Sequence, residues 1–200
     1  PTTPATPKPA NNEIWYTNGS TTTATTPYST TVFGANIVSN LYDAEKECWV
    51  ITFDGDVTMI GYEAFNAKNL TGITIPDSVT TIGSNAFYYC SKLKNIHIPQ
   101  NVTEIKDAFS GCTSLVGVHI NDIVSWCSIN FNSTNPLYYA KNLYLNGELI
   151  TDLVIPKEAS LISDRAFKNC TCITSITIED GVASIGNATF SGCSSLTSVT

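Results

Sequence analysis

A phenylalanine that follows a small residue recurs along this chain at a nearly constant interval. Phe65, Phe87 and Phe109 are spaced 22 residues apart, and each comes directly after alanine. The pattern resumes at Phe167, again after alanine, and Phe190 follows 23 residues later. Self-similarity with a period of about 20 to 50 residues is typical of repeat architectures, in which each unit packs against its neighbours. This period constrains the fold more than any other feature.

The residues around each phenylalanine also recur, in the order Ile-Gly-x-x-Ala-Phe, x-x-Cys-x-x-Leu, x-x-Ile-x-Ile-Pro and x-x-Val-Thr-x. Five copies follow this phrase, and the last stops at Thr200 within an expected strand, so either the natural chain continues or the last coil is frayed. An earlier, degenerate copy begins near residue 49. Its apolar positions match those of the next copy at an offset of 22 residues: Ile51, Phe53, Val57 and Ile60 correspond to Ile73, Ile75, Val79 and Ile82.

The phrase can be interpreted physically as one coil of a solenoid. Its Leu-x-x-Ile-x-Ile segment ends in the alternation of a short β-strand with inward isoleucines, and proline, which lacks an N–H, ends the strand. One coil cannot bury its own apolar row, whereas stacked coils with parallel strands about 4.8 Å apart can. Each buried Ile or Phe then contributes about 1.5–3 kcal/mol. The predicted fold class is a leucine-rich-repeat solenoid at 49–200, mostly short parallel β-strands with turns and short helical segments on the other side.

The chain before the repeat divides into two parts. Residues 1–12 are rich in Pro and Thr, which predicts a flexible linker. Residues 13–48 lack the repeat, but Ile14-Trp15-Tyr16 and Val32-Phe33 are typical of strands, and Ile37 to Tyr42 could pair with them. Because a solenoid needs a cap over its first coil, we expect a small N-terminal β cap at 13–48.

The repeat spacing is interrupted once. From Ile120 to Ile155 the chain advances 35 residues instead of 22 or 23, so one coil carries extra residues, which we place at about 142–153. Within this insert, Tyr144 to Leu149 has apolar flanks around Asn-Gly, a strong signal for a β-hairpin. Bulkier side chains replace the usual Ala-Phe before the insert, and residues 122–129 could form a short helix.

The composition excludes some classes of partner. The formal net charge is −7 and no basic stripe is present, so a phosphate backbone would be repelled and nucleic acid is not an expected partner. No run of about 18 apolar residues exists, so no membrane-spanning helix is predicted. Charged residues make up only 14% of the chain, against about a quarter in typical domains. Ser, Thr and Asn take their place, which suits a secreted or cell-surface protein.

The repeat resembles a known family. The segments IGSNAFYYCSKLKNIHIPQNVTEI and SIGNATFSGCSSLTSVT are similar to the BspA-like leucine-rich repeats of Bacteroidetes surface proteins, and NPLYYAKNLYLNGELITDLVIP resembles a variant unit of that group. The resemblance covers about residues 49–200. It implies a cell-surface or secreted protein, for which an outer-membrane lipoprotein anchor is one option, and adhesion to host matrix proteins such as fibronectin and fibrinogen. Similar repeats occur in surface proteins of some mucosal protists, so the organism stays open.

The outward positions between the strand isoleucines form one candidate site. The only two histidines, His97 and His119, occupy this position in successive copies and should stack on the exposed sheet face. No carboxylate joins them in that row, so we expect no metal site. Solenoids commonly recognise partners through such rows, and the alternative is a plain polar surface. The hypothetical protein-binding face comprises Thr74, Asn95, His97, His119, Ser175 and Thr177.

Tyrosines form a second candidate site. Tyr88 and Tyr89 follow Phe87, where other copies carry smaller or charged residues, and they cannot both face inward. Exposed aromatic side chains favour contacts with proteins or sugars, and packing against the insert is the alternative. The predicted aromatic patch comprises Tyr88, Tyr89, Tyr138, Tyr139 and Tyr144.

Four of the seven cysteines lie three residues after the repeat phenylalanine: Cys90, Cys112, Cys170 and Cys193. This slot predicts small, buried thiols in the coil interior, and because disulfide geometry is demanding we expect them to be free. Cys170-x-Cys172 is not a zinc spacing without a second pair. The pattern assigns no role to the three cysteines outside the slot, Cys48, Cys127 and Cys172.

No motif for catalysis or cofactor binding is present: the chain has no nucleophile elbow, phosphate loop or dinucleotide fingerprint. We therefore expect neither an enzyme nor a bound cofactor. The favoured function is a non-enzymatic cell-surface scaffold that recognises host or neighbouring proteins, extracellular-matrix proteins among them, through the exposed sheet face. A carbohydrate-binding surface module and a passive spacer for another domain are the alternatives.

Overall fold

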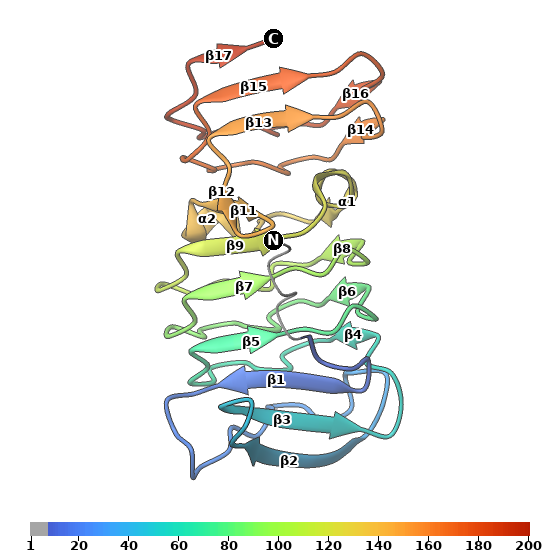
Figure 1. Ribbon diagram of the computed structural model, residues 1–200, viewed down its shortest axis with the longest axis vertical. Helices are drawn as coiled ribbons and strands as arrows, with labels where there is room; N and C mark the ends of the chain where they lie inside the picture. Colours follow the sequence, from blue (N-terminus) through green and yellow to red (C-terminus); the bar gives the residue numbers. More distant parts are fainter. Residues whose placement is uncertain (1–7) are drawn as a thin grey trace.

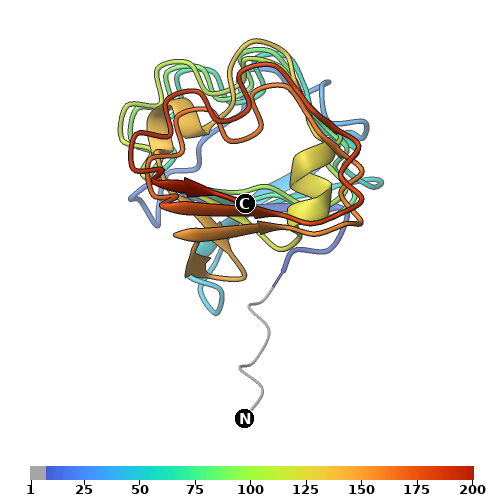
Figure 2. The same cartoon turned by 90° about the horizontal axis from the view of Figure 1, so that it is seen from above.

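The computed structural model describes residues 8–200, which form a β-solenoid of about six turns with few helices. In Figure 1 the turns stack along the long axis, from the N-terminal strands at the bottom to the last turn at the top. Figure 2, which looks along the stack, shows successive turns superimposed around one interior. The solenoid that the repeat period predicts is confirmed.

Two rows of parallel strands build the first part of the solenoid. The row that we call the front sheet consists of β5 (Gly72–Thr74), β7 (Asn95–His97), β9 (Gly117–Ile120) and β11 (Leu143–Leu145). The second row consists of β4 (Met59–Ile60), β6 (Thr81–Ile82), β8 (Glu104–Ile105) and β10 (Asn130–Phe131). Equivalent inward residues lie side by side in neighbouring strands: Ile96 beside Val118, and Ile82 beside Ile105.

The last turns repeat the same two rows as separate sheets. One sheet joins β13 (Asp152–Ile155), β15 (Ser175–Ile178) and β17 (Ser198–Val199) in parallel. The other joins β14 (Leu161–Ile162) and β16 (Ser184–Ile185). The outward surface of the solenoid is therefore divided into two sheets along its length.

Phenylalanine rings form a column through the interior. The rings of Phe65 and Phe87 stack with centroids 5.7 Å apart, and those of Phe87 and Phe109 with centroids 5.2 Å apart. The column resumes with Phe167 and Phe190, whose centroids are 5.5 Å apart. All of these rings except that of Phe190 are buried. Within each run of regular coils, one ring covers the next, which is why a single coil could not exclude water from its interior.

Each regular coil adopts the left-handed backbone conformation at the same two positions, two residues before and two residues after the phenylalanine. The first position is occupied by Glu63, Asn85, Asp107, Arg165 and Ala188, and the second by Ala67, Tyr89, Gly111, Asn169 and Gly192. Residues other than Gly, Asn and Asp adopt this backbone conformation only at a cost in free energy. Half of the ten residues are Gly, Asn or Asp and half are not, so the stacking of coils imposes these corners where local residue preference does not supply them.

The N-terminal strands add to the front sheet in an unexpected order. β1 (Glu13–Thr17), β2 (Ile37–Asp43) and β3 (Cys48–Phe53) form a sheet with β5 in the order β2-β3-β1-β5. β3 is the strand of the degenerate first copy, and β1 runs antiparallel between it and β5. The first two copies therefore pair directly in the second row, where β4 is parallel to β6, but not in the front sheet, where β1 separates their strands.

Two expectations for the segment 13–48 need correction. No strand forms at Val32-Phe33; instead the buried ring of Phe33 packs against Phe53 and Phe65 with centroids 5.1 and 5.8 Å away. Phe33 thus adds one ring to the end of the phenylalanine column. The segment Ile37 to Tyr42 does pair, but with β3 rather than with an earlier strand.

Residues 8–12, the described part of the predicted linker, are bonded to the solenoid. The carbonyl of Asn11 accepts from the N–H of Val57 at 2.8 Å, and that of Asn12 accepts from the N–H of Phe53 at 2.9 Å. Lys8 forms an ion pair with Asp77 at 2.9 Å. A flexible linker is the wrong description of this segment, because its backbone satisfies N–H groups at the coil edge. The rest of the predicted linker, residues 1–7, lies outside the described residues.

The coil at residues 121–142 departs from the repeat. It contains α1 (Ile123–Ser128), which confirms the predicted short helix, and α2 (Leu137–Ala140). The side chain of Asp122 caps α1 by accepting hydrogen bonds from the backbone N–H groups of Val124 and Ser125. Burial of Trp126 and Phe131, with ring centroids 5.0 Å apart, fills the interior of this coil.

Side chains also replace backbone hydrogen bonds in this coil. In regular coils the phenylalanine N–H donates to the carbonyl of the residue before the next phenylalanine, as Phe87 does to Ala108. The corresponding carbonyl of Ala166 instead accepts from Nε1 of Trp126 at 3.0 Å and from Nδ2 of Asn135 at 3.2 Å. The atypical coil therefore stacks on the next coil without the repeat sequence.

The predicted hairpin is confirmed, but the limits of the insert are wrong. β11 pairs in parallel with β9, so Leu143–Leu145 is a strand of the front sheet rather than inserted chain. β12 (Glu148–Leu149) folds back antiparallel to β11 across Asn146 and Gly147, which both have positive φ. β13 follows almost at once, so a hairpin stands where a full return coil would be expected. In Figure 1 this hairpin lies between β9 and β13, where the outward surface divides.

Candidate interaction surface

One row of outward side chains crosses the front sheet. Strand register places Trp15 of β1 opposite Thr74, His97 beside His119, and His119 beside Tyr144. β5 and β7 are neighbours in the stack (Figure 1), and the N–H of Lys94 donates to the carbonyl of Thr71, so Thr74 and His97, each three residues further on, continue the same row. We call these five residues the His strip. The sequence-predicted residues Thr74, His97 and His119 are thus brought together.

Asparagines from neighbouring coils hold the two imidazoles in place. Nε2 of His97 lies 2.5 Å from Oδ1 of Asn121, and Nε2 of His119 lies 3.3 Å from Oδ1 of Asn95. Asn121 in turn donates from Nδ2 to Oδ1 of Asn146 in the hairpin turn at 3.0 Å. The predicted residue Asn95 therefore belongs to this site as a support for His119. These contacts join three successive coils on the outer surface.

Burial lowers the pKa of both histidines. For His97 the hydrogen bond with Asn121 offsets this effect in part, and for His119 the proximity of His97 adds to it. Both imidazoles are therefore neutral at pH 7, because their pKa values lie below the ordinary value of about 6.5. At neutral pH the His strip is a surface of aromatic rings and one threonine hydroxyl, supported by neutral asparagine amides.

Two of the predicted face residues lie elsewhere. Ser175 and Thr177 belong to β15, in the sheet beyond the hairpin. There Ser175 donates its hydroxyl to Asp152 at 2.5 Å, and Thr177 pairs with Val154. The prediction of one continuous row is wrong, because the hairpin at 143–149 separates these residues from the His strip.

Sequence reasoning missed three members of this surface. Trp15 was detectable, since the alternation of β1 buries Ile14 and Tyr16 and turns Trp15 outward. Asn121 and Asn146 had no comparable signal, because their role depends on the register between coils.

The tyrosines divide between two places. Tyr88 and Tyr89 lie in edge-to-face contact with centroids 4.5 Å apart, and Tyr138 and Tyr139 do so at 5.0 Å. These four residues form one corner, which we call the tyrosine patch. Gly111 joins the two pairs: its N–H donates a hydrogen bond to the hydroxyl of Tyr139 at 3.0 Å, and a Cβ added to it would touch Tyr89. Burial raises the pKa of Tyr88, with smaller contributions from the neighbouring phenols of Tyr89 and Tyr139.

Tyr144 does not belong to the tyrosine patch. It lies on the front sheet, where its ring stacks on that of His119. The prediction of a five-tyrosine patch is therefore wrong for this residue, because β11 continues the front sheet and turns Tyr144 toward its outer surface.

The interior contains thiols but no disulfide among the described residues. The four slot cysteines are buried, as predicted, and all seven cysteines are free. Within residues 8–200, no group of three His, Cys, Asp or Glu side chains is placed to hold a metal ion.

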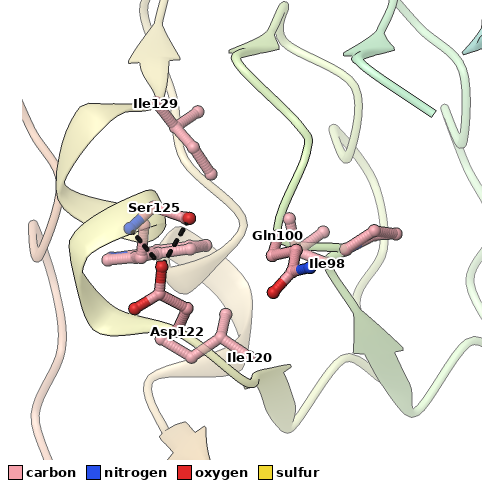
Figure 3. Close-up of a pocket in the computed structure, with 8 residues that line it drawn as sticks. Ile98, Gln100, Ile120, Asp122, Ser125 and Ile129 are labelled. Carbon is pink, nitrogen blue, oxygen red and sulfur yellow. Dashed lines mark hydrogen bonds between the residues drawn. The ribbon is translucent and has the colours of Figure 1, made fainter. Parts of the chain in front are cut away.

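A small pocket lies where α1 meets the coil before it (Figure 3). Ile98, Ile120 and Trp126 are among the residues that line it, together with Asp122 and Ser125. Its volume of about 10 Å³ is about the space that one water molecule needs. The carboxylate of Asp122 is committed to capping α1 and accepts the Ser125 hydroxyl at 2.6 Å. This pocket is too small for an organic substrate.

Comparison with known proteins identifies the repeat. The family described as BspA type leucine rich repeat region matches six copies at residues 11–138 and 137–200. No match was found among curated proteins. In the described part of the chain, no helix has the length and apolar character needed to span a bilayer.

Solved leucine-rich-repeat structures are similar to this chain. The protein TpLRR of T. pallidum is 28% identical over 74% of this chain and 65% of its own, with a TM-score of 0.44. A protein from Bacteroides ovatus ATCC 8483 is 30% identical over 72% of this chain and 35% of its own, with a TM-score of 0.40. A cell surface protein from Faecalibacterium prausnitzii A2-165 is 24% identical over 88% of this chain and 55% of its own, with a TM-score of 0.42.

This chain therefore spans less than two thirds of each of these solved chains. The family match, in contrast, extends over nearly all of the described residues. The chain belongs to the BspA-type leucine-rich-repeat family.

Proposed function

We propose that this chain is a non-enzymatic scaffold, displayed at the cell surface or secreted, whose His strip binds a protein. Membership of the family suggests a protein-interaction or surface-scaffold role. The partner class that we propose is a host extracellular-matrix protein or a neighbouring surface protein. The observation that carries the proposal is the register that aligns Trp15, His97, His119 and Tyr144 on one open sheet face.

The chemistry of the His strip suits a protein partner. Trp and Tyr are enriched among the residues that dominate protein–protein binding, because each presents a large surface with few rotatable bonds. The asparagine contacts and the stack of His119 on Tyr144 fix these side chains before binding. A surface that is already ordered loses less conformational entropy on association. Because the imidazoles are neutral at pH 7, no charge has to be desolvated there.

The proposal can be tested by measuring binding of the purified chain to immobilised fibronectin and fibrinogen with biolayer interferometry. We expect saturable binding to at least one of them. His119→Glu places a carboxylate at the centre of the strip, and we expect it to weaken binding about tenfold or more, since the loss of a central contact commonly costs about 1–2 kcal/mol or more.

Thr177→Glu provides the matched control, because Thr177 has the same outward position on a parallel strand but lies beyond the hairpin. Unchanged binding by this variant would assign recognition to the His strip. Equal losses in both variants would show that the two sheets bind as one face. If the unmodified chain binds neither protein, these two matrix proteins are not its partners, and the host-adhesion form of the proposal fails.

Carbohydrate binding by the tyrosine patch is a second candidate. Tyr89 and Tyr138 are 58% and 51% exposed, and Nζ of Lys141 lies 5.3 Å from the ring centre of Tyr138. Exposed aromatic rings with a polar group nearby are suited to sugar contacts. A glycan array should then show ligands that are lost with Tyr138→Ala and kept with Tyr144→Ala. If neither the protein assay nor the glycan array detects binding, a passive spacer is favoured.

A further inference from the structure

We propose that Cys170 and Cys172 form a reactive dithiol, distinct from the five other cysteines, which closes to an intramolecular disulfide by exchange with a small-molecule disulfide. The proposal does not depend on the proposed binding function. It rests on how this coil departs from the repeat in both its thiols and its backbone.

The cysteine slot has a regular hydrogen bond in three coils. In each of them the thiol donates to the phenylalanine carbonyl of the preceding coil, which keeps the S–H occupied in the interior. The pairs are Cys90 with Phe65 at 3.0 Å, Cys112 with Phe87 at 3.1 Å, and Cys193 with Phe167 at 3.2 Å.

Cys170 is the exception. The preceding coil is the atypical one at residues 121–142, and it has no repeat phenylalanine to supply that carbonyl. The sulfur of Cys170 lies instead 3.4 Å from the sulfur of Cys172. Two positions after the slot, the other three coils carry Lys92, Ser114 and Ser195. The dithiol therefore occurs at the coil whose usual thiol acceptor is missing.

The backbone of the same turn is also different. In the other three coils the residue after the slot donates its N–H to a carbonyl two residues earlier, as Thr113 does to Gly111. Thr171 donates instead to the carbonyl of Lys141 at 2.9 Å. Lys141 ends α2 in the left-handed conformation, with a φ of 62°. The turn that carries both sulfurs is thus held by the atypical coil.

The surroundings of the two sulfurs assign their roles. Cys170 is buried, whereas Cys172 is partly exposed and can be reached from solvent. The S–H of Cys170 lowers the pKa of Cys172, and backbone N–H groups of Leu143 and of Cys172 itself lower it further against the effect of burial. The same contact, together with burial, raises the pKa of Cys170. Cys172 is the nucleophile, since the thiolate is the reactive form.

Burial raises the pKa of the remaining thiols. This holds for Cys48 and, in the interior, for Cys90, Cys112, Cys127 and Cys193. The four interior cysteines are almost fully enclosed. A small disulfide should therefore react with Cys172 before it reacts with any of them.

The exchange proceeds in two balanced steps. The thiolate of Cys172 attacks one sulfur of the small disulfide, forms a mixed disulfide and releases one thiolate, which takes up a proton. The sulfur of Cys170 then loses its proton to solvent, attacks the sulfur of Cys172 and releases the second thiolate. Two protein thiols are oxidised to one disulfide, and one small disulfide is reduced to two thiols.

The test uses the folded chain and oxidised glutathione. Trypsin cleaves after Lys168 and a glutamate-specific protease cleaves after Glu179, so the peptide 169–179 contains Cys170 and Cys172 and no other cysteine. After exposure at pH 7 and trapping of free thiols, we expect this peptide to have lost the mass of two hydrogen atoms. The other cysteines should remain reduced.

A Cys172→Ser variant supplies the control, because serine occupies the equivalent position in two regular coils. It should form no disulfide within peptide 169–179 while its circular dichroism stays unchanged. On the unmodified chain, Cys172 should also react with iodoacetamide about tenfold faster than Cys112 or Cys193 at pH 7. A dithiol peptide left intact, a mixed disulfide that never closes, or equal alkylation rates would each overturn the proposal.

Discussion

The imidazole of His119 stacks on the phenol ring of Tyr144, with centroids 4.5 Å apart and planes inclined by 14°. The pair joins β9, the last front strand of the regular coils, to β11, which leads into the hairpin. Gly117 lies beside it: a Cβ there would fall 2.6 Å from Oδ1 of Asn95 and 3.0 Å from Cε2 of Tyr144. The stack therefore depends on the absence of a side chain at residue 117.

Gly117→Ala should destabilise the front sheet. The added methyl group has to displace the amide of Asn95, which breaks its contact with His119, and to push Tyr144 from its position. Overpacking of this kind costs typically about 1–3 kcal/mol, and we expect the lower end because the side chains are at the surface. Urea denaturation followed by circular dichroism would measure the loss in the free energy of unfolding.

Gly55→Ala is the control for the change in unfolded-state conformational entropy that any glycine-to-alanine substitution causes. Like Gly117, Gly55 has no positive φ, but a Cβ added to it would have the Cβ of Ala35 as its nearest neighbour, at 3.8 Å, an ordinary contact. This variant should be neutral or slightly stabilising. A Gly117→Ala chain as stable as Gly55→Ala would show that the His119–Tyr144 stack can shift without cost.

Acid should weaken the fold before the carboxylates titrate. Burial lowers the pKa of His97 and His119 in the folded chain, whereas in the unfolded chain they titrate near about 6.5. Below that pH the unfolded state binds more protons than the folded state, so the free energy of unfolding falls as the pH decreases. Urea denaturation at pH 7 and pH 5 should show this loss.

The double variant His97→Gln, His119→Gln separates this effect from other titrations. Glutamine keeps a polar side chain but cannot be protonated, so the difference in stability between pH 7 and pH 5 should shrink. Asp107 and Asp122 have pKa values lowered by hydrogen bonds that outweigh burial, and their contribution is lost only at more acidic pH. The same slope in both chains would mean that the histidines are not the groups responsible.

The period of the sequence was enough to predict the columns of the solenoid. Phe65, Phe87 and Phe109 stack as their spacing requires, and Cys90 and Cys112 are buried in their slot. These features depend only on each coil packing against a copy of itself. Within consecutive regular coils, a residue that recurs in phase therefore stacks on its equivalent, as these rings do.

The rest depends on contacts between segments that do not repeat. The sequence of β1 does not by itself specify that it lies antiparallel between β3 and β5, because this arrangement depends on pairing with strands far away in the sequence. The spacing from Ile120 to Ile155 reveals extra chain but not its position. The predicted binding face is divided because a hairpin takes the place of a return coil, which puts Ser175 and Thr177 in a different sheet from His97 and His119.

Phe87→Ala should destabilise the chain more than Phe190→Ala. Phe87 is buried between two stacked rings, whereas Phe190 is partly exposed and has one stacked neighbour, Phe167. Removing a buried phenylalanine costs about 3–5 kcal/mol, and we expect less than half of this at Phe190. Thermal and urea denaturation would give both values. Equal losses would show that the column does not act as a cooperative interior.

Ala67→Gly should stabilise the chain. Ala67 has a φ of 54° at the corner where two other coils carry Gly111 and Gly192. The left-handed conformation costs a residue other than glycine about 1–2 kcal/mol, and the greater freedom of glycine in the unfolded chain takes back about 0.5–1 kcal/mol. The expected net gain is about 0.5–1 kcal/mol in the free energy of unfolding. Ala64→Gly, at a buried position without positive φ, should instead destabilise. A loss of stability in both variants would mean that the corner at Ala67 is not strained.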